Sequence, residues 1–206
     1  MNHILSKYCP RIEFDSYEDF YNNFAIEVPE NFNFAYDVVD EWARVEPQKK
    51  ALVWCNDEDE EKTLTFTEIS RLSDRLANAL TGLGIVKGDI VLLVLKQRWE
   101  YWVCAIALNK IGAILIPATA QLTKKDLVYR LNASEAKALI TLDDAYVREQ
   151  VAAALPECPT LEHRILVNTK TEDWEGEGWL SFDELVEQAS ADWQRPTGDA
   201  ATTNDD

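Results

Sequence analysis

The stretch DIVLLVLKQRWEYWVCAIALNKIGAILIPA, residues 89–118, decides the fold. It opens with Ile90 to Leu95, a continuous apolar run that is typical of a strand covered on both faces in a parallel sheet. From Trp99 to Ile111, apolar residues occur almost all the way round a predicted helix, with Lys110 as its main charge. The helix should therefore be buried, and it is too short to cross a bilayer. A second strand, Ala113 to Ile116, completes one βαβ unit with a right-handed crossover.

The rest of the chain repeats this unit. Strand starts are expected near Ile90, Ala113, Lys137 and Arg164, evenly spaced and each followed by a helix pattern or a turn. An amphipathic helix is predicted over residues 33–45, before the first of them, because apolar side chains recur there at helical spacing, at Phe34, Val38, Trp42 and Val45. This order predicts an α/β fold, with a partial doubly wound, mainly parallel sheet and flanking helices.

Capping-box patterns mark further helix starts. Thr65 and Ser181 are each followed three residues later by Glu, and Thr123 is followed by Asp126. In this motif the hydroxyl of the Ser or Thr accepts a hydrogen bond from the backbone N–H of the acidic residue. The acidic side chain in turn accepts one from the backbone N–H of the Ser or Thr.

Two short strands, Ala51 to Trp54 and Thr63 to Phe66, flank the acidic run at 56–62. Carboxylates can bind hard cations, but such sites need ligands at folded spacings with a glycine-type turn, and none is present. A solvated hairpin tip is the favoured interpretation.

The chain is predicted to divide into three parts. Residues 1–32 form an N-terminal arm, residues 33–191 form the α/β domain, and residues 192–206 form an unstructured polar linker, because that end is small and polar. A parallel sheet interrupted within a domain would leave an unpaired edge and an uncovered apolar face, which predicts a marginally soluble fragment.

The composition excludes several classes of protein. The net charge of −17 repels phosphate backbones and anionic lipid, so neither nucleic acid nor a membrane is an expected partner. The four Cys are far apart in the sequence, which favours free thiols in a reducing compartment. The N-terminal residues lack a signal-peptide core and are acidic early, so a cytoplasmic location is expected.

The sequence lacks the common short motifs of nucleotide binding and of nucleophilic catalysis. The sequence contains no G-x-x-x-x-G-K-[ST], no G-x-G-x-x-G and no G-x-S-x-G. His3 and His163 stand alone, and His163 is interpreted as a surface residue. No catalytic residue and no metal ligand is therefore assigned.

Three stretches together resemble the adenylate-forming enzymes, and within them the medium-chain acyl-CoA synthetases. LTFTEI at 64–69 is similar to an L-[ST]-[YF]-x-E-[LI] box. LNKIGA at 108–113, continued by IPAT at 116–119, is similar to an L-x-x-x-G-A-x-x-x-P segment. QL at 121–122 followed by DLVYRL at 126–131 matches the medium-chain branch, and the similarity covers about residue 32 to the C-terminus.

The resemblance implies a reaction class. Such enzymes join a carboxylic acid, here a fatty acid, to ATP with Mg²⁺, giving an acyl-adenylate and diphosphate. The thiol of coenzyme A then displaces AMP. The protein contributes positioning and charge stabilisation.

The chain also departs from the family pattern. The family's phosphate loop, T-S-G-T-T-G-x-P-K-like, and its C-terminal domain are expected beyond the last residue. The resemblance therefore implies an N-terminal portion that is inactive alone and binds neither ATP nor coenzyme A well. A non-catalytic α/β binding module is one alternative, and one half of a split synthetase, completed by a complementary C-terminal chain, is another.

One residue carries over from the family as a cofactor contact. Gln121 corresponds to a Gln that contacts coenzyme A in the medium-chain branch, and its amide can both donate and accept hydrogen bonds. A loop residue without a role is the alternative. The aromatic residues at 99–102 could flank an acyl pocket, but anchoring of the core is the favoured role.

Overall fold

A computed structural model describes residues 4–167 and 178–204, and its centre is a five-stranded parallel sheet of order β4-β3-β5-β6-β7. The strands are β3 (Ile90–Val94), β4 (Ile114–Pro117), β5 (Ala138–Leu142), β6 (His163–Val167) and β7 (Leu180–Ser181). The α/β fold predicted from the sequence is confirmed, and four of these strands start within one residue of the position that the sequence predicts.

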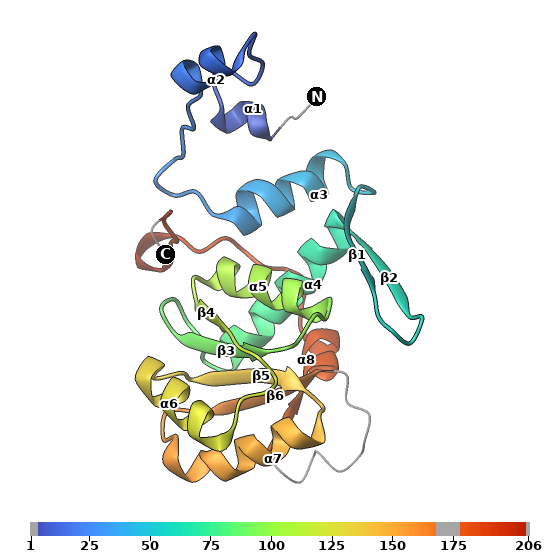
Figure 1. The fold of residues 1–206 in the computed structure, drawn as a ribbon, viewed down its shortest axis with the longest axis vertical. Coiled ribbons are helices and arrows are strands. Elements are labelled where there is room, and N and C mark those ends of the chain that lie inside the picture. Colours follow the sequence, from blue (N-terminus) through green and yellow to red (C-terminus); the bar gives the residue numbers. More distant parts are fainter. Residues whose placement is uncertain (1–3, 168–177, 205–206) are drawn as a thin grey trace.

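Helices cover both faces of the sheet (Figure 1). Helices α4 (Phe66–Gly82), α5 (Glu100–Ile111) and α8 (Phe182–Gln188) pack on one face. Helices α6 (Lys124–Ser134) and α7 (Ala145–Ala154) pack on the other. A short 3-10 turn, Leu155–Glu157, extends α7. The sheet is thus the middle of three layers.

Strand β3 shows why the sequence run at its position is apolar throughout. Val91 and Leu93 belong to the core shared with α4 and α5, whereas Leu92 and Val94 belong to the core shared with α6 and α7. Successive side chains of a strand point to opposite faces, so a strand between two helix layers needs apolar residues at every position.

Helix α4 begins at the predicted capping box. The Glu68 N–H donates to Thr65 Oγ1 over 3.2 Å, and the Thr65 N–H donates to the Glu68 carboxylate over 2.7 Å. The hydrogen bond from the Thr65 N–H is the main cause that lowers the pKa of Glu68. Two otherwise unpaired N–H groups of the first turn are satisfied in this way.

Helix α5 ends at Gly112, which has a φ of +80°. A Cβ atom there would lie 2.9 Å from the Thr202 methyl group and 3.1 Å from Lys87 Cγ. The position therefore requires glycine for its left-handed backbone and for the close approach of its neighbours.

The helix predicted over 33–45 is present but starts as a π-helix, η1 (Ala35–Asp40), which continues as α3 (Glu41–Val45). The wider π turn changes which side chains face inward: Ala35 and Val39 are buried, whereas Phe34 is 52% exposed. The amphipathic pattern read from Phe34 thus named the wrong side chain at the start of the helix.

The two predicted short strands form a separate antiparallel hairpin of β1 (Lys50–Cys55) and β2 (Glu61–Thr65). The acidic run forms its tip, where the Asn56 side-chain oxygen accepts from the N–H groups of Glu58 and Glu60 over 3.0 Å each. The favoured interpretation as a hairpin tip is confirmed.

Residues before η1 carry α1 (Leu5–Tyr8) and α2 (Tyr17–Asn23), which lie at one end of the molecule in Figure 1. Ser16 Oγ accepts from the Asp19 N–H over 3.1 Å and caps α2. The division of the chain into an arm and a domain at residue 32 remains a prediction.

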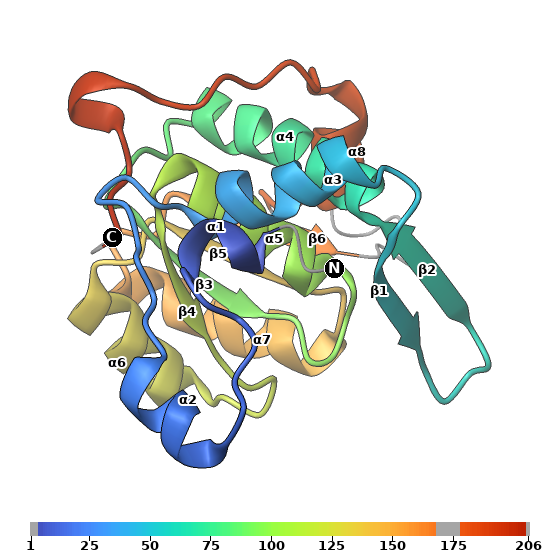
Figure 2. The same cartoon turned by 90° about the horizontal axis from the view of Figure 1, so that it is seen from above.

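The end of the chain is ordered against the domain, which corrects the prediction of an unstructured linker for its described part. Figure 2 shows the segment passing over α4. Trp193 Nε1 donates to Tyr36 Oη over 2.8 Å, and Lys87 Nζ donates to the Ala201 carbonyl over 2.7 Å. A 3-10 turn, Gly198–Ala200, lies between these contacts. Small and polar residues find partners here, so composition alone misjudged the segment.

Replacing Thr65 by Ala should lower the free energy of unfolding by about 1 kcal/mol, because the Glu68 N–H loses its acceptor, Thr65 Oγ1. The Thr65→Ser variant keeps the hydroxyl and should stay close to the parent protein. Urea denaturation followed by circular dichroism measures both. An equal loss in the two variants would show that the methyl group, and not the cap, matters here.

Candidate functional site

The carboxyl ends of β3 and β5 mark the place where the order of strands reverses. From β3 the chain crosses to β4 on one side, and it then returns to β5 on the other side of β3. The loops leaving two such strands diverge, and in open α/β sheets the crevice between them is where ligands bind.

A cavity of about 380 Å³ occupies this position. Its lining comes from the loop after β3 (residues 96–98), the loop after β5 (residues 142–144), Val167 at the end of β6, and residues 54–57 of the hairpin. The hairpin thus closes one side of a crevice that the sheet topology creates.

Arg98 and Trp54 make one wall of the cavity. The Arg98 guanidinium binds the Glu100 carboxylate with two hydrogen bonds, of 2.9 and 2.6 Å, and Glu100 is buried. The hydrogen bonding to Glu100 raises the pKa of Arg98. Arg98 also lies over the Trp54 ring at 5.2 Å, and Trp54 Nε1 donates to the Gln97 carbonyl over 2.7 Å.

Lys96 and Asp144 make the opposite wall, with Lys96 Nζ 3.3 Å from Asp144 Oδ2. Burial raises the pKa of Asp144, but hydrogen bonds from Val147 and pairing with Lys96 outweigh it and leave that pKa below its ordinary value. Lys96 has a φ of +50°, which is a strained backbone for a residue with a side chain.

Both basic side chains of the cavity are therefore already neutralised, Lys96 by Asp144 and Arg98 by Glu100. A triphosphate carries several negative charges and needs cations or N–H groups that are free to meet it. The cavity does not fit a triphosphate, and its chemistry suits a neutral polar group.

Gln121, the predicted cofactor contact, lies in the loop between β4 and α6, and its side chain is exposed. Its N–H donates to Thr119 Oγ1 over 3.3 Å. Strands β3, β4 and β5 are parallel, so Gln121 and the cavity belong to the same edge of the sheet, but Gln121 does not line the cavity.

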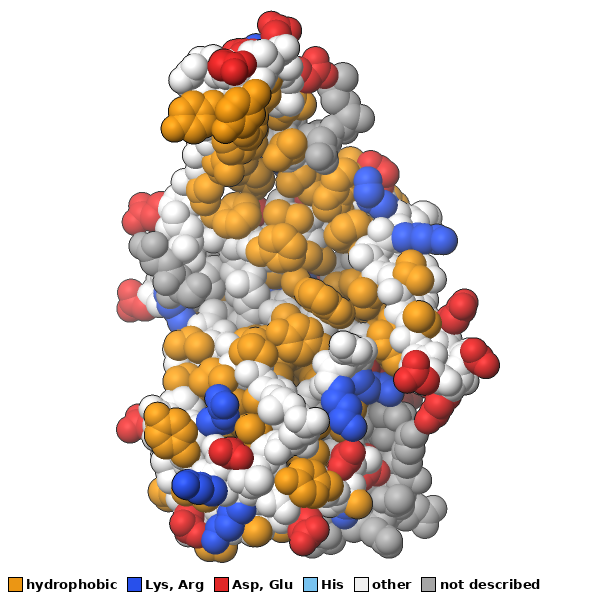
Figure 3. Space-filling view, viewed as in Figure 1, with side chains coloured by type: hydrophobic (Ala, Val, Ile, Leu, Met, Phe, Trp, Pro, Cys, Tyr) orange, Lys and Arg blue, Asp and Glu red, His pale blue; other side chains and the backbone are white. Residues whose placement is uncertain are grey.

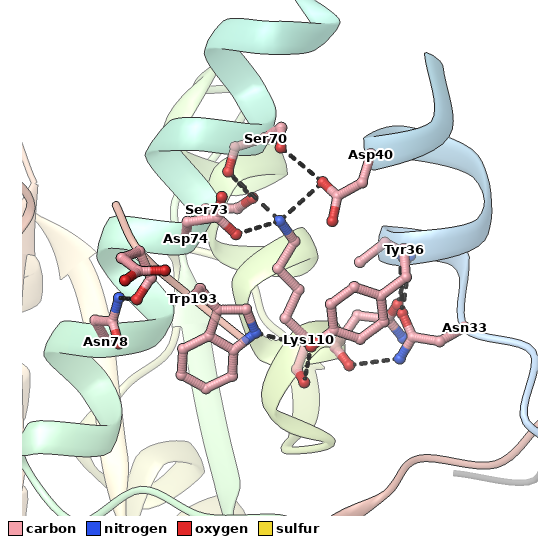
Figure 4. A network of polar contacts seen from close by, with 12 residues as sticks. Asn33, Tyr36, Asp40, Ser70, Ser73, Asp74, Asn78, Lys110 and Trp193 are labelled. Carbon is pink, nitrogen blue, oxygen red and sulfur yellow. Dashed lines mark hydrogen bonds and ion pairs between the residues drawn. The ribbon is translucent and has the colours of Figure 1, made fainter. Parts of the chain in front are cut away.

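A second polar cluster surrounds Lys110, which is completely buried in α5 (Figure 4). Lys110 Nζ lies 2.5 Å from Asp74 Oδ1 in α4 and 2.9 Å from Asp40 Oδ1 in η1. Burial raises the pKa of Asp74 despite the nearby Lys110 cation. Sequence reasoning identified the charge on this apolar helix but not its two partners.

The cluster continues from Lys110 to the end of the chain. Tyr36 Oη donates to the Lys110 carbonyl over 2.8 Å and accepts from Trp193. Burial raises the pKa of Tyr36 to about 12. Lys110 has no exposed surface, and its cluster joins α5 to α4, to η1 and to the last segment of the chain.

His163 and the aromatic residues at 99–102 that the sequence singled out do not line the cavity. His163 Nε2 lies 2.8 Å from the Leu83 carbonyl, and His3 lies outside the described residues. Trp99 packs against the α4–α5 core, as the favoured anchoring role requires, whereas Trp102 is 52% exposed.

In the part of the chain that the structure describes, no three His, Cys, Asp or Glu side chains gather as a metal site would require. No helix in residues 4–167 and 178–204 has the length and apolar character needed to span a membrane.

Comparison with known proteins identifies the class. The family model described as AMP-binding enzyme matches residues 39–205, so the chain belongs to this family. It is 41% identical over 171 residues to acyl-coenzyme A synthetase ACSM5, mitochondrial, of Homo sapiens, covering 80% of this chain and 28% of that protein. It is 37% identical over 183 residues to acyl-coenzyme A synthetase ACSM3, mitochondrial, of Mus musculus, covering 86% of this chain and 30% of that protein.

A solved structure supports the fold. The anthranilate CoA ligase AuaEII in complex with anthranoyl-AMP superposes with a TM-score of 0.71 at 23% identity, covering 82% of this chain and 30% of that one. The chain thus spans less than a third of the length of these proteins. The resemblance seen in the sequence motifs is confirmed.

The cytoplasmic location expected from the N-terminal sequence is contradicted by these relatives, whose names place them in mitochondria. The acidic residues near position 15 argue only against a mitochondrial targeting sequence among these residues. They do not show in which compartment members of the family act.

Replacing Lys110 by Met should lower the free energy of unfolding by about 3 kcal/mol at neutral pH, because two carboxylates lose their cation. Without Lys110 the already raised pKa of Asp74 rises further. As the pH falls through that pKa the carboxyl group becomes neutral, so the loss should be smaller at pH 5 than at pH 8.

Urea denaturation at several pH values measures this difference. Lys124→Met is the matched control, because its ion pair with Glu157 has side chains that are 48% and 55% exposed. That variant should lose about 0.5 kcal/mol or less at either pH. A pH-independent loss for Lys110→Met would refute the role given to Asp74.

Proposed function

We propose that this chain is the N-terminal part of an ATP-dependent, AMP-forming acyl-CoA synthetase. The observation that carries the proposal is the family match along residues 39–205, together with 41% identity to an acyl-coenzyme A synthetase. The reaction joins a carboxylic acid to ATP and then transfers the acyl group to coenzyme A. The mitochondrial relatives support a mitochondrial location.

Within such an enzyme this chain provides the central sheet and one side of the path by which coenzyme A enters. Its sheet presents its carboxyl edge, with Gln121 on an exposed loop that a polar cofactor can reach. The cations of the nearby cavity are neutralised, so the groups that hold the phosphates of ATP and Mg²⁺ belong to the remaining part of the enzyme. The chain alone is inactive.

The test is a hybrid in which this chain replaces the matching segment of human acyl-coenzyme A synthetase ACSM5. The hybrid should catalyse ATP–diphosphate exchange that depends on a fatty acid such as butyrate. The 206-residue chain should show none under the same conditions.

A folded hybrid without exchange would contradict the assignment of this chain to a synthetase, and would favour a non-catalytic binding module. Exchange by the chain alone would contradict its role as scaffold. Activity restored by adding the rest of ACSM5 as a separate polypeptide would favour the split enzyme.

Gln121→Ala in the hybrid should raise the KM for coenzyme A by about fivefold, the value of one lost hydrogen bond. ATP–diphosphate exchange, which precedes the entry of coenzyme A, should not change. Lys125→Ala, an exposed neighbour at the start of α6, is the control and should leave both quantities unchanged. A fall in exchange with an unaltered KM for coenzyme A would rule out the cofactor contact.

A further inference from the structure

A groove lined entirely by apolar side chains opens between α5, η1 and the hairpin. It has a volume of about 270 Å³. Its lining includes Phe34, Val39, Leu52, Phe66, Trp102 and Ile106. No charged or polar side chain enters this lining, so its occupant must itself be apolar.

The two aromatic side chains at the rim of this α5 groove are open to solvent, since Phe34 and Trp102 are each 52% exposed. A second groove, between α1 and α3, adds Leu5, Val38 and Trp42 to the same side of the molecule. Figure 3 shows hydrophobic side chains gathered in a band over this side. A band of this kind marks a surface that another polypeptide covers.

A second copy of this chain is a poor occupant. Each copy carries a net charge of −17, and two such chains repel one another at close approach. The occupant must also offer enough apolar area to bury two exposed aromatic side chains, which typically dominate the energy of an interface.

The end of the described chain lies at the border of the α5 groove. Thr202, Thr203 and Asn204 share with Phe34 a small cavity of about 180 Å³. The relatives carry more than two thirds of their length outside the segment that this chain matches. A polypeptide continuing from Asn204 would therefore start beside the groove.

We propose that the α5 groove, with Trp102 and Phe34 at its rim, is the docking surface for the remaining part of the AMP-binding enzyme. This inference rests on the proposed function. It assigns Trp102 to an interface, and not to the core or to an acyl pocket. The groove accounts for an apolar surface that the chain itself leaves uncovered.

Hydroxyl-radical labelling read by mass spectrometry tests the proposal on the 206-residue chain and on the ACSM5 hybrid. Labelling of Trp102 and Phe34 should be about fivefold or more slower in the hybrid, because the core of an interface excludes water. Tyr129, which is 73% exposed on α6, is the control and should change by less than about twofold. Trp102→Glu should lower the melting temperature of the hybrid, whereas Trp102→Phe should not.

The outcomes separate this inference from the proposed function. An active hybrid in which Trp102 is labelled as fast as in the chain alone overturns the docking surface only. A protected Trp102 in an inactive hybrid supports docking and overturns the function. If light scattering shows that the chain alone dimerises and Trp102→Glu abolishes the dimer, the occupant is a second copy and the proposal fails.

Discussion

The burial of β3 on both faces is the constraint from which the architecture follows. Leu92 and Leu93 point to opposite sides, and each is almost completely buried. Removing two such side chains from water contributes about 2 kcal/mol each, which is obtained only if helices cover both faces. Parallel neighbours on both sides of β3 then require the chain to reverse its winding direction, and the cavity lies at that reversal.

The buried Lys110 adds a second constraint, because it determines where the neighbouring elements must lie. A cation without solvent requires anionic partners at close range, and here they come from α4 and η1. The hydroxyl of Tyr36 extends the cluster to Trp193. Helix α5 thus fixes η1 and, through η1, the last segment of the chain.

Much of the fold could be predicted because its signals are local. The apolar run of β3, the glycine after α5 and the Thr65–Glu68 pair each act within a few residues. The inward face of η1 was misjudged because a π turn shifts the spacing on which the prediction relied. The last segment was misjudged because its partners lie more than 110 positions away.

The candidate site was less predictable than the fold. Its cavity combines a hairpin tip with two loops that only the folded sheet brings together. The pairing of Lys96 with Asp144 spans 48 positions, so the sequence could not show that the basic residue is neutralised. The role of Gln121 rests on family resemblance and remains a prediction.

The Asn33 side chain has a consequence for the order of events as the polypeptide emerges from the ribosome. Its amide nitrogen donates to the Asn109 carbonyl over 2.8 Å and to Thr202 Oγ1 over 3.0 Å, and the second bond joins positions 169 apart. Contacts of such separation form late, because loop-closure entropy must first be overcome. Synthesis must reach Thr202 before this junction can form, so Asn33, made early, waits for almost the whole described chain before it gains its last partner.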